Sequence, residues 1–401
     1  MKTPMLASHK LCTGCGACAA ICQLGAISVE RENDGHYYPH VDHRVCVGCS
    51  QCEKVCPVQS AFEYGNNSML STPLKAWNNN DEQRLRSSSG GVFSALAYWF
   101  IEQGGYVSGA IIDKLQIKHI VSRDIKDISR MQGSKYLQSE TTEAFKRILE
   151  LLPDHKVLFS GTGCQVGGLL CLVRKKNPEL LSNLFCVDIV CDGVPSYRLL
   201  EKTIESLHCN DVSIVSFRNK SKGWNKTPKE LILSVDGVEK NLGEANLMIC
   251  GFNKSLTSRY SCYDCQFAYT DRLSDITIAD FWGVENESDE NLYNGVSLAI
   301  VHSTKGQQLL DDANIQTSLV EWSEATKVNF RIYQGKKYGF DNTWLRRNLG
   351  FLFDRLPYSD LNRFYGAALK SRFDLVGRAV HRWYHRKAKK MKKSINKNKL
   401  V

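Results

Sequence analysis

Apolar positions between residues 74 and 345 follow the periods of both regular secondary structures. Val212 to Phe217 and Glu230 to Val235 alternate apolar and polar residues, as half-buried strands do, and an Asp236-Gly237 turn signal follows them. Continuous apolar runs predict further strands at 74–77, 106–112, 119–122, 156–159, 184–190 and 275–279. Helical patterns occur at 92–103, 142–152 and 197–207, and another ends near residue 176. Strands that alternate with helices predict a mixed α/β domain.

The N-terminal 65 residues have a different pattern, which is set by cysteine. They contain Cys12-x2-Cys15-x2-Cys18-x3-Cys22 and then Cys46-x2-Cys49-x2-Cys52-x3-Cys56-Pro57. This is the ligand run of bacterial ferredoxins, present twice, in which the fourth cysteine of each run binds the other cluster. We therefore expect one [4Fe-4S] cluster on Cys12, Cys15, Cys18 and Cys56, and a second on Cys46, Cys49, Cys52 and Cys22.

Two alternatives to clusters exist for these thiols. Zinc is usually held by two separated ligand pairs, which these four-cysteine runs fit poorly. Disulfides require an oxidising compartment. The first run departs from the usual pattern only at Gln23, where proline is common but is not a ligand. Between the runs, Asp34-Gly35 signals a hairpin turn, and His36, His40 and His43 are expected to be surface residues of that hairpin.

Charge is concentrated at the C-terminus. The net charge is +10, yet residues 378–401 hold ten Lys or Arg and no acid, which leaves the rest of the chain neutral. This distribution argues against a nucleic-acid-binding core. No apolar leader or membrane-length run is visible, which favours a cytoplasmic setting.

The basic tail has an amphipathic pattern. One helical face carries Phe373, Val376, Val380, Trp383 and Tyr384, with basic residues around it. Such a helix can lie on an anionic membrane surface, here the inner face, and a solvated tail is the alternative.

Four further cysteines stand at predicted strand ends or in turns: Cys164, Cys191, Cys262 and Cys265. Strand-end loops of an α/β sheet converge on one edge, so these thiols could form a third four-cysteine site. A pair of ordinary thiols or half of a zinc site are the alternatives for the Cys262-x2-Cys265 motif. Cys164 lies in a glycine-rich stretch, 160–168, that is predicted to be a loop and matches neither the dinucleotide nor the P-loop spacing.

Seven motifs occur in a characteristic order along the chain. They are Ser-Ser-Gly-Gly-Val-Phe (88–93), Gly-Ser-Lys-Tyr (133–136), Gly-Thr-Gly-Cys-Gln-Val-Gly-Gly-Leu (161–169), Cys-Asp-Gly-Val-Pro-Ser (191–196), Ser-Phe-Arg-Asn-Lys (216–220), Arg-x2-Cys-x2-Cys (259–265) and Ser-Asp-Ile-Thr-Ile-Ala-Asp-Phe-Trp-Gly (274–283). Together they resemble the beta-subunit family of the coenzyme F420 (deazaflavin) hydrogenases and dehydrogenases. The sequence departs from the family at Gly163, where proline is frequent, and at Asp192, where histidine is frequent.

The resemblance implies a fold and a division of the chain. The expected fold is an α+β ferredoxin-like dicluster module, then a mixed α/β catalytic domain that binds flavin, then a basic C-terminal helix. The corresponding segments are a 2x[4Fe-4S] domain at 1–65, the beta-subunit N-terminal domain at 74–155, its C-terminal domain at 156–345 and the helical tail at 346–401.

The resemblance also implies cofactors. Members hold FAD beside an iron–sulfur cluster, which supports a third [4Fe-4S] cluster on Cys164, Cys191, Cys262 and Cys265. The implied flavin contacts are Ser89, Gly90, Gly91, Gly133, Ser134, Lys135, Gly161 and Gly163.

The expected function is a ferredoxin-dependent iron–sulfur flavoprotein that passes electrons through its clusters to FAD and an organic substrate. Ferredoxin, or another low-potential donor, is the expected partner. The alternative is an electron-transfer subunit that serves a partner enzyme, and a chain that lost the flavin is a rival interpretation. No catalytic residue stands out, although Asp192 and Asp280 are candidate proton donors by position.

Overall fold

The computed structural model describes residues 4–59, 71–224, 229–243, 246–253, 255, 257–270, 272–284, 290–335 and 347–362. The predicted amphipathic tail beyond 362 and most of the predicted linker at 64–73 lie outside these residues. Among the described residues, no helix has both the length and the apolar character needed to cross a membrane.

The N-terminal module is built from two short helices and a hairpin, α1 (Ala17–Ile21), β1 (Ile27–Arg31), β2 (Tyr37–Val41) and α2 (Gln51–Lys54). The strands are antiparallel, and Gly35 in the predicted turn has a φ of 77°. The expectation that His36 is a surface residue is wrong. His36 is buried and its Nε2 donates to the carbonyl of Thr257, because the hairpin turn packs against the rest of the chain.

The main domain is a nine-stranded sheet in the order β14-β3-β13-β12-β8-β7-β4-β5-β6. Its centre, β12-β8-β7-β4, is parallel, and the strands toward either edge include antiparallel pairs. The sheet takes strands from both sides of the predicted boundary at 155/156. Their bounds are β3 (Thr72–Asn78), β4 (Tyr106–Asp113), β5 (Gln116–Ser122), β6 (Ser139–Glu140), β7 (Val157–Thr162), β8 (Leu184–Ile189), β12 (Ile276–Asp280), β13 (Ser297–Val301) and β14 (Ile315–Leu319).

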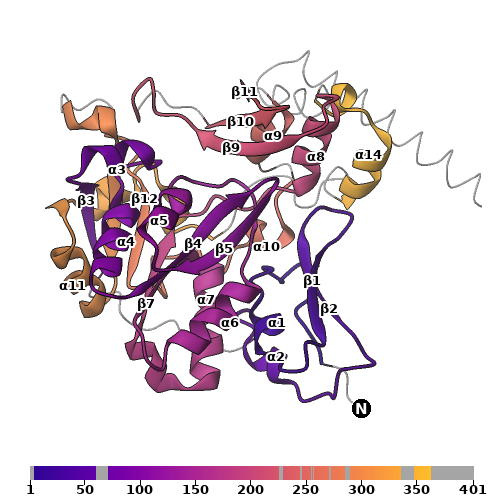
Figure 1. Ribbon diagram of the computed structural model, residues 1–401, viewed down its shortest axis with the longest axis horizontal. Helices are drawn as coiled ribbons and strands as arrows, with labels where there is room; N and C mark the ends of the chain where they lie inside the picture. Colours follow the sequence, from indigo (N-terminus) through magenta and orange to yellow (C-terminus); the bar gives the residue numbers. More distant parts are fainter. Residues whose placement is uncertain are drawn as a thin grey trace, which may run out of the picture.

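Helices cover both faces of this sheet (Figure 1). On β7, Leu158 faces the core that α4 (Val92–Glu102), α5 (Ile125–Met131) and α11 (Thr304–Asp312) share. Its neighbours Val157 and Phe159 face the opposite core, with α6 (Thr142–Leu151) and α7 (Gly163–Lys176). Because side chains alternate along a strand, a continuous apolar run is what a strand covered on both faces requires.

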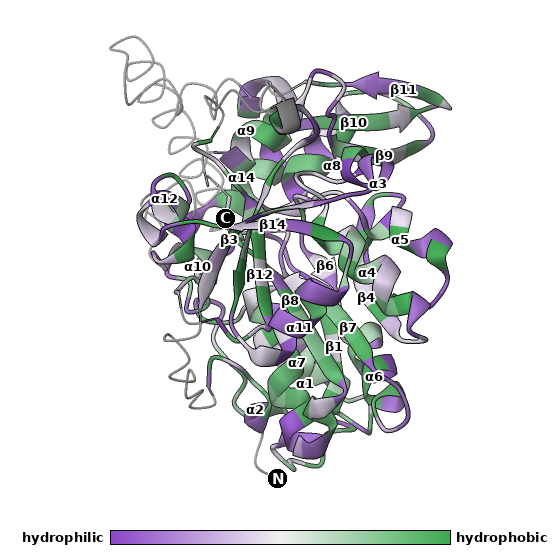
Figure 2. Cartoon of the chain, turned by 90° about the vertical axis from the view of Figure 1, so that its left-hand side faces the viewer, coloured by the Kyte–Doolittle hydropathy of each residue, from purple (hydrophilic) through white to green (hydrophobic). Residues whose placement is uncertain are grey.

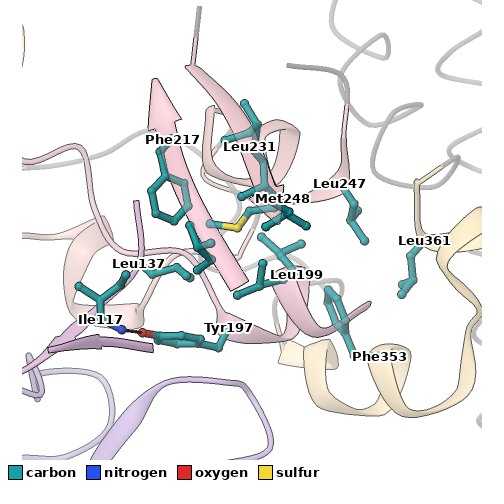
Figure 3. Packing of buried hydrophobic residues seen from close by; sticks show 14 of the residues in the cluster. Ile117, Leu137, Tyr197, Leu199, Phe217, Leu231, Leu247, Met248, Phe353 and Leu361 are labelled. Carbon is teal, nitrogen blue, oxygen red and sulfur yellow. Dashed lines mark hydrogen bonds between the residues drawn. The ribbon is translucent and has the colours of Figure 1, made fainter. Parts of the chain in front are cut away.

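A smaller antiparallel sheet, β11-β10-β9, lies beside the main sheet, above it in Figure 1. Its strands are β9 (Val212–Arg218), β10 (Lys229–Val235) and β11 (Val238–Asn241). Figure 2 shows β11 as the hydrophilic strand of this sheet, and all four of its residues are exposed. The apolar face packs on α8 (Tyr197–Glu205), α9 (Leu247–Asn253) and α14 (Leu349–Arg355), as Figure 3 shows. The remaining described helices are α3 (Asp81–Arg86), η2 (Pro178–Ser182), α10 (Tyr260–Tyr263), η4 (Glu290–Asn294), α12 (Trp322–Thr326) and η5 (Phe330–Ile332).

The N-terminal module shares a core with the main domain. Cys15, Ala17 and Val55 pack in one cluster with Phe145 of α6 and the apolar face of α7. A Cβ placed on Gly168 of α7 would lie 2.8 Å from the Cys15 Sγ atom. Glycine at this position therefore lets the module approach the helix backbone closely.

Tyr197 joins the two sheets. Its buried hydroxyl accepts a hydrogen bond from the Ile117 N–H on β5 (3.1 Å, dashed in Figure 3) and donates one to the carbonyl of Gln138 (2.8 Å). We expect Tyr197→Phe to lower the free energy of unfolding by about 1–3 kcal/mol, because both backbone groups lose a partner inside the core.

Urea unfolding under anaerobic conditions measures this change. The control is Tyr293→Phe, which removes a hydroxyl that is bonded to the Ser221 carbonyl at an exposed position. We expect that control to stay within about 0.5 kcal/mol of the parent. Equal stability of the Tyr197 and Tyr293 variants would contradict the proposed role of the buried hydroxyl.

Candidate electron-transfer site

The two cysteine runs of the module adopt the same backbone conformation. Gly14 and Gly48, each two residues after the first cysteine of its run, have φ values of 66° and 70°. Gly16 and Ser50, which precede α1 and α2, are also left-handed, at 78° and 55°. Since only small or polar residues adopt this conformation readily, the residues between the cysteines fix the turn of each run.

The first cysteine set surrounds a cavity at the buried side of the module. Cys12, Cys15, Cys18 and Cys56 all line it, together with Leu6, Val29 and Pro57. Burial, with a smaller effect of the nearby Cys56 and Cys12 thiols, raises the pKa of Cys15 to about 12. The fourth cysteine of the second run therefore lies with the first three of the first run, as a crossed ferredoxin arrangement requires.

The second cysteine set lies nearer the surface. Cys52 is buried against Ala19 and is packed with Cys22. Burial is the main cause of the raised pKa of Cys52, and the neighbouring Cys49 thiol adds to it. Cys49 itself is exposed, and Leu24, Val45 and Val47 beside this set are exposed as well.

Among the described residues, no group of three or more His, Cys, Asp or Glu side chains is arranged to hold one metal ion. The first set instead lines a cavity, and cluster binding would require its thiols to release their protons, since thiolates are the ligands.

The third set comes together at the carboxyl edge of the parallel strands. Cys164 lies at the start of α7, directly after β7, and Cys191 follows the adjacent parallel strand β8. Burial is the main cause that raises the pKa of Cys164, and the Cys265, Cys191 and Cys262 thiols all contribute. All four thiols are therefore neighbours in space, although the chain separates them by up to a hundred residues.

The stretch 160–168 is not a loop, contrary to expectation. Residues up to Thr162 belong to β7, and α7 begins at Gly163. A capping box joins Thr162 and Gln165, in which the Gln165 side chain accepts from the Thr162 N–H at 2.9 Å. The strand therefore passes straight into the helix, and the cap fixes Cys164 in the first turn.

Polar groups surround the third set. The Thr162 hydroxyl lies 3.1 Å from the Cys164 Sγ atom, and the Gly193 N–H donates to the Cys191 Sγ atom at 3.3 Å. The Arg331 guanidinium lowers the pKa of Cys191 and Cys265 against the larger effect of burial. Hydrogen bonds and positive charge near cluster sulfurs favour the reduced state of a cluster.

Both departures from the family pattern lie at this edge. A Cβ on Gly163 would be 3.2 Å from the Asp188 Oδ2 atom and from the Cβ of Phe267, so the residue is closely packed. Asp192 lies 3.9 Å from the Arg331 Nε atom and is accessible.

Asp280 is bound by Arg218, at 2.9 and 3.0 Å, and by the Trp224 indole. Asp280 is therefore part of an ion pair at this edge of the sheet.

A separate cavity of about 520 Å³ opens beside the small sheet. Its walls are the 85–88 and 129–135 segments, the end of β4 and strand β9. Its described lining contains six basic side chains and no acidic one: Arg86, Lys114, Arg130, Lys135, Arg218 and Lys220. Serine hydroxyl groups add to this lining, from Ser87, Ser88, Ser129, Ser134, Ser213 and Ser216. Such a lining suits a ligand with several negative charges, such as a dinucleotide pyrophosphate.

The predicted flavin contacts divide into three groups. Gly133, Ser134 and Lys135 line this cavity. Ser89, Gly90 and Gly91 do not; the Ser89 hydroxyl donates to the Val296 carbonyl, and a Cβ on Gly90 would lie 2.5 Å from the Ala76 carbonyl oxygen. Gly161 and Gly163 lie at the third cysteine set. Ser87 and Ser88, just before the predicted triplet, take its place in the cavity wall.

Lys135 is held by the end of α5. Its Nζ donates to the carbonyls of Arg130, Met131 and Gln132 at 2.8–3.0 Å, which uses all three protons of an ammonium. Burial lowers the pKa of Lys135 to about 7. Lys220 is held similarly by three carbonyls, and burial lowers its pKa to about 7 as well. The sequence motif at 216–220 includes Arg218 and Lys220, but the residue types alone did not indicate that these side chains line a cavity.

Comparison with known proteins supports both parts of the chain. Residues 11–60 match the 4Fe-4S dicluster domain, and residues 154–327 match the family described as the C terminus of the coenzyme F420 hydrogenase/dehydrogenase beta subunit. Nothing among the curated proteins matches the chain.

One solved structure to which the chain is similar is the xenon-derivatised F420-reducing [NiFe] hydrogenase complex from Methanosarcina barkeri. The identity is 20%, over 76% of this chain and 93% of that chain, with a TM-score of 0.43, at which the likeness supports no argument about function. On the two domain matches, this chain is an iron–sulfur electron-transfer protein of the oxidoreductase class, which has a 4Fe-4S dicluster domain at the N-terminus and a region, 154–327, similar to the C terminus of the coenzyme F420 hydrogenase/dehydrogenase beta subunit.

Proposed function

We propose that this protein is the flavin-binding electron-transfer subunit of an oxidoreductase. Electrons from ferredoxin, or another low-potential donor, pass one at a time through three [4Fe-4S] clusters to FAD, which serves a partner enzyme or an organic substrate. The ligands are the crossed sets of the module and Cys164, Cys191, Cys262 and Cys265.

The segment from Ser134 to Ser139 carries this proposal, because it connects the basic cavity with residues beside the first and third cysteine sets. Ser134 lines the basic cavity, and four residues later the Gln138 amide donates to the carbonyl of Gly14, at 2.9 Å, beside the first cysteine set. Ser139 receives a hydrogen bond from Gln165, the residue after Cys164. Four residues span at most about 14 Å, so the cavity is close to the proposed clusters.

The surface-facing cysteine set suits the entry of electrons. Cys49 is exposed, and the apolar side chains of Leu24, Val45 and Val47 surround this set at 43–55% exposure. A diffusing donor can therefore approach the second set, while the first set is enclosed between the module and α7.

The basic cavity suits FAD at the opposite end. A bound flavin accepts two electrons, whereas each cubane passes one, so the clusters can load it stepwise. Arg86 and Lys114 can neutralise the pyrophosphate, and the Ser88 hydroxyl fixes the 133–135 segment by accepting from the Ser134 N–H at 2.7 Å. Phe217 is the aromatic residue of the described lining, and Tyr136 packs edge-on against it, with ring centroids 5.8 Å apart.

A self-contained reductase is the second candidate, because residues of this chain alone line a cavity of about 520 Å³. Anaerobic reconstitution with FAD, followed by addition of reduced ferredoxin, tests the shared part of both. We expect the flavin absorbance to bleach through the clusters. Protein with fully assembled clusters that never retains FAD would contradict both candidates, and reduction of an organic acceptor without a partner would favour the reductase.

The third cluster predicts an iron count. We expect Cys262→Ser to lose about four of roughly twelve iron atoms while the module keeps its own, because one of four thiolates is removed. Iron and acid-labile sulfide in anaerobically purified protein provide the measurement. Cys209→Ser is the control, since that thiol packs beside the core of the small sheet. An unchanged iron count in Cys262→Ser would contradict the assignment.

The basic cavity predicts a charge effect on FAD affinity. We expect the Arg86→Gln/Lys114→Gln double variant to bind FAD roughly tenfold to a hundredfold more weakly, because two exposed cations leave the cavity wall. Lys175→Gln/Lys176→Gln removes the same charge from the exposed end of α7 and should bind FAD normally. Calorimetry on reconstituted protein decides, and equal affinities of the two double variants would refute this placement of the flavin.

A further inference from the structure

Arg259 is a buried cation at the junction between the module and the third cysteine set. Its side chain is 1% exposed, and its backbone precedes Cys262 by one helical turn. The guanidinium donates from Nε to the Cys12 carbonyl at 2.7 Å, and from Nη1 to the Gln138 Oε1 atom at 2.9 Å. Nη2 donates to the Tyr37 carbonyl and lies 3.6 Å from the Cys12 Sγ atom.

These partners satisfy the hydrogen bonds of Arg259 but do not neutralise its charge. Two carbonyls, an amide and the ring of Tyr38, 4.3 Å below the guanidinium carbon, all present partial charges only. No described carboxylate forms an ion pair with Arg259. An arginine stays protonated in proteins, and burying an unneutralised charge is costly.

Three other buried arginines near the sheet edge have carboxylates beside them. Arg218 pairs with Asp280 at 2.9 Å and Arg272 with Asp188 at 3.2 Å, while Asp192 lies 3.9 Å from Arg331. Among the described contacts of Arg259, the atom that can bear a full negative charge is the Cys12 sulfur, once this thiol is a cluster ligand.

We propose that the iron–sulfur cluster of the first set is the counter-ion of Arg259, and that Arg259 thereby raises the reduction potential of this cluster above that of the second. This inference rests on the proposed cluster ligands. A [4Fe-4S] centre with four thiolates carries two negative charges when oxidised and three when reduced, so a buried cation stabilises the reduced form more. The second cluster loses one electron, the first gains it, and Arg259 keeps its protons.

Arg44, the arginine closest in sequence to the second set, does not provide a comparable buried charge. Arg44, two residues before Cys46, is 90% exposed and pairs with Asp42 at 2.9 Å. Water screens such a charge. The difference between the two sets therefore directs electrons from the exposed cluster to the enclosed one.

Arg259 is also fixed relative to the third set. Its N–H donates to the Val194 carbonyl at 2.9 Å, and its own carbonyl accepts from the Cys262 N–H at 3.0 Å. The Ser261 hydroxyl donates to the Cys12 carbonyl at 3.0 Å. The residue that contacts the first set is thus part of the turn that presents Cys262 and Cys265.

Redox potentiometry followed by EPR on the full, anaerobically purified chain tests the proposal. The two module signals are assigned from Cys56→Ser and Cys22→Ser variants. In Arg259→Gln we expect the potential of the first cluster to fall by about 59 mV or more, which is a tenfold change in the equilibrium constant for transfer between the clusters. Arg44→Gln is the matched control and should leave both potentials unchanged.

A second variant keeps the arginine and adds a negative charge beside it, with the loss of the bond from the Gln138 amide to the Gly14 carbonyl. Gln138→Glu places a carboxylate where the amide oxygen now accepts from Arg259 Nη1, so the guanidinium gains a protein counter-ion and the first cluster's potential should also fall. If Arg259→Gln fails to assemble but Gln138→Glu shows no shift, Arg259 is only structural and the proposal is overturned. Unchanged potentials in both variants overturn it too. A parent protein without two module signals would overturn the cluster assignment itself, and this inference with it.

Discussion

The close contact between α7 and the Cys15 thiol determines how the module and the main domain fit together. Gly168 leaves the space that this thiol occupies, and Cys164 lies one turn earlier on the same helix. Residues four apart share a helix face and are separated by about 6 Å along its axis. A single helix therefore brings the first and third cysteine sets together, and a side chain at position 168 would separate them.

Features that neighbouring residues encode could be predicted from the sequence, whereas features formed by distant segments were harder to predict. The doubled cysteine run and the apolar strands are encoded by neighbouring residues, and the dicluster domain and the central parallel strands were predicted from them. Cys164 and Cys191 of the third set meet because β7 and β8 are adjacent parallel strands, which strand order along the chain suggests but does not fix. The basic cavity joins segments near 86, 132 and 216, and no spacing rule connects them.

Glycine has a packing role in two places where the sequence suggested a loop. The Ser89-Gly90-Gly91 triplet stays a predicted flavin contact, and Gly90 allows a close approach to the backbone of β3 and β13. The glycines of 160–168 suggested a loop, whereas Gly163 begins α7, and Gly167 and Gly168 face Phe267 and Cys15. In both cases glycine serves close packing, which a sequence cannot distinguish from ligand binding without knowing what lies opposite. His36 is a similar case, since its hairpin is covered by a distant part of the chain.

The shared core of the module and the main domain has a kinetic consequence. Cys15, Ala17 and Val55 are enclosed with side chains of α6 and α7, and the core that the module makes by itself consists of Ala19, Ile27 and Cys52 with a few partly buried neighbours. A module anchored in this way is held at a fixed distance from the third cysteine set. The proposed electron transfer inside the chain therefore needs no movement of a domain. The concentration-dependent steps of the proposed pathway are then the arrival and departure of molecules at its two ends.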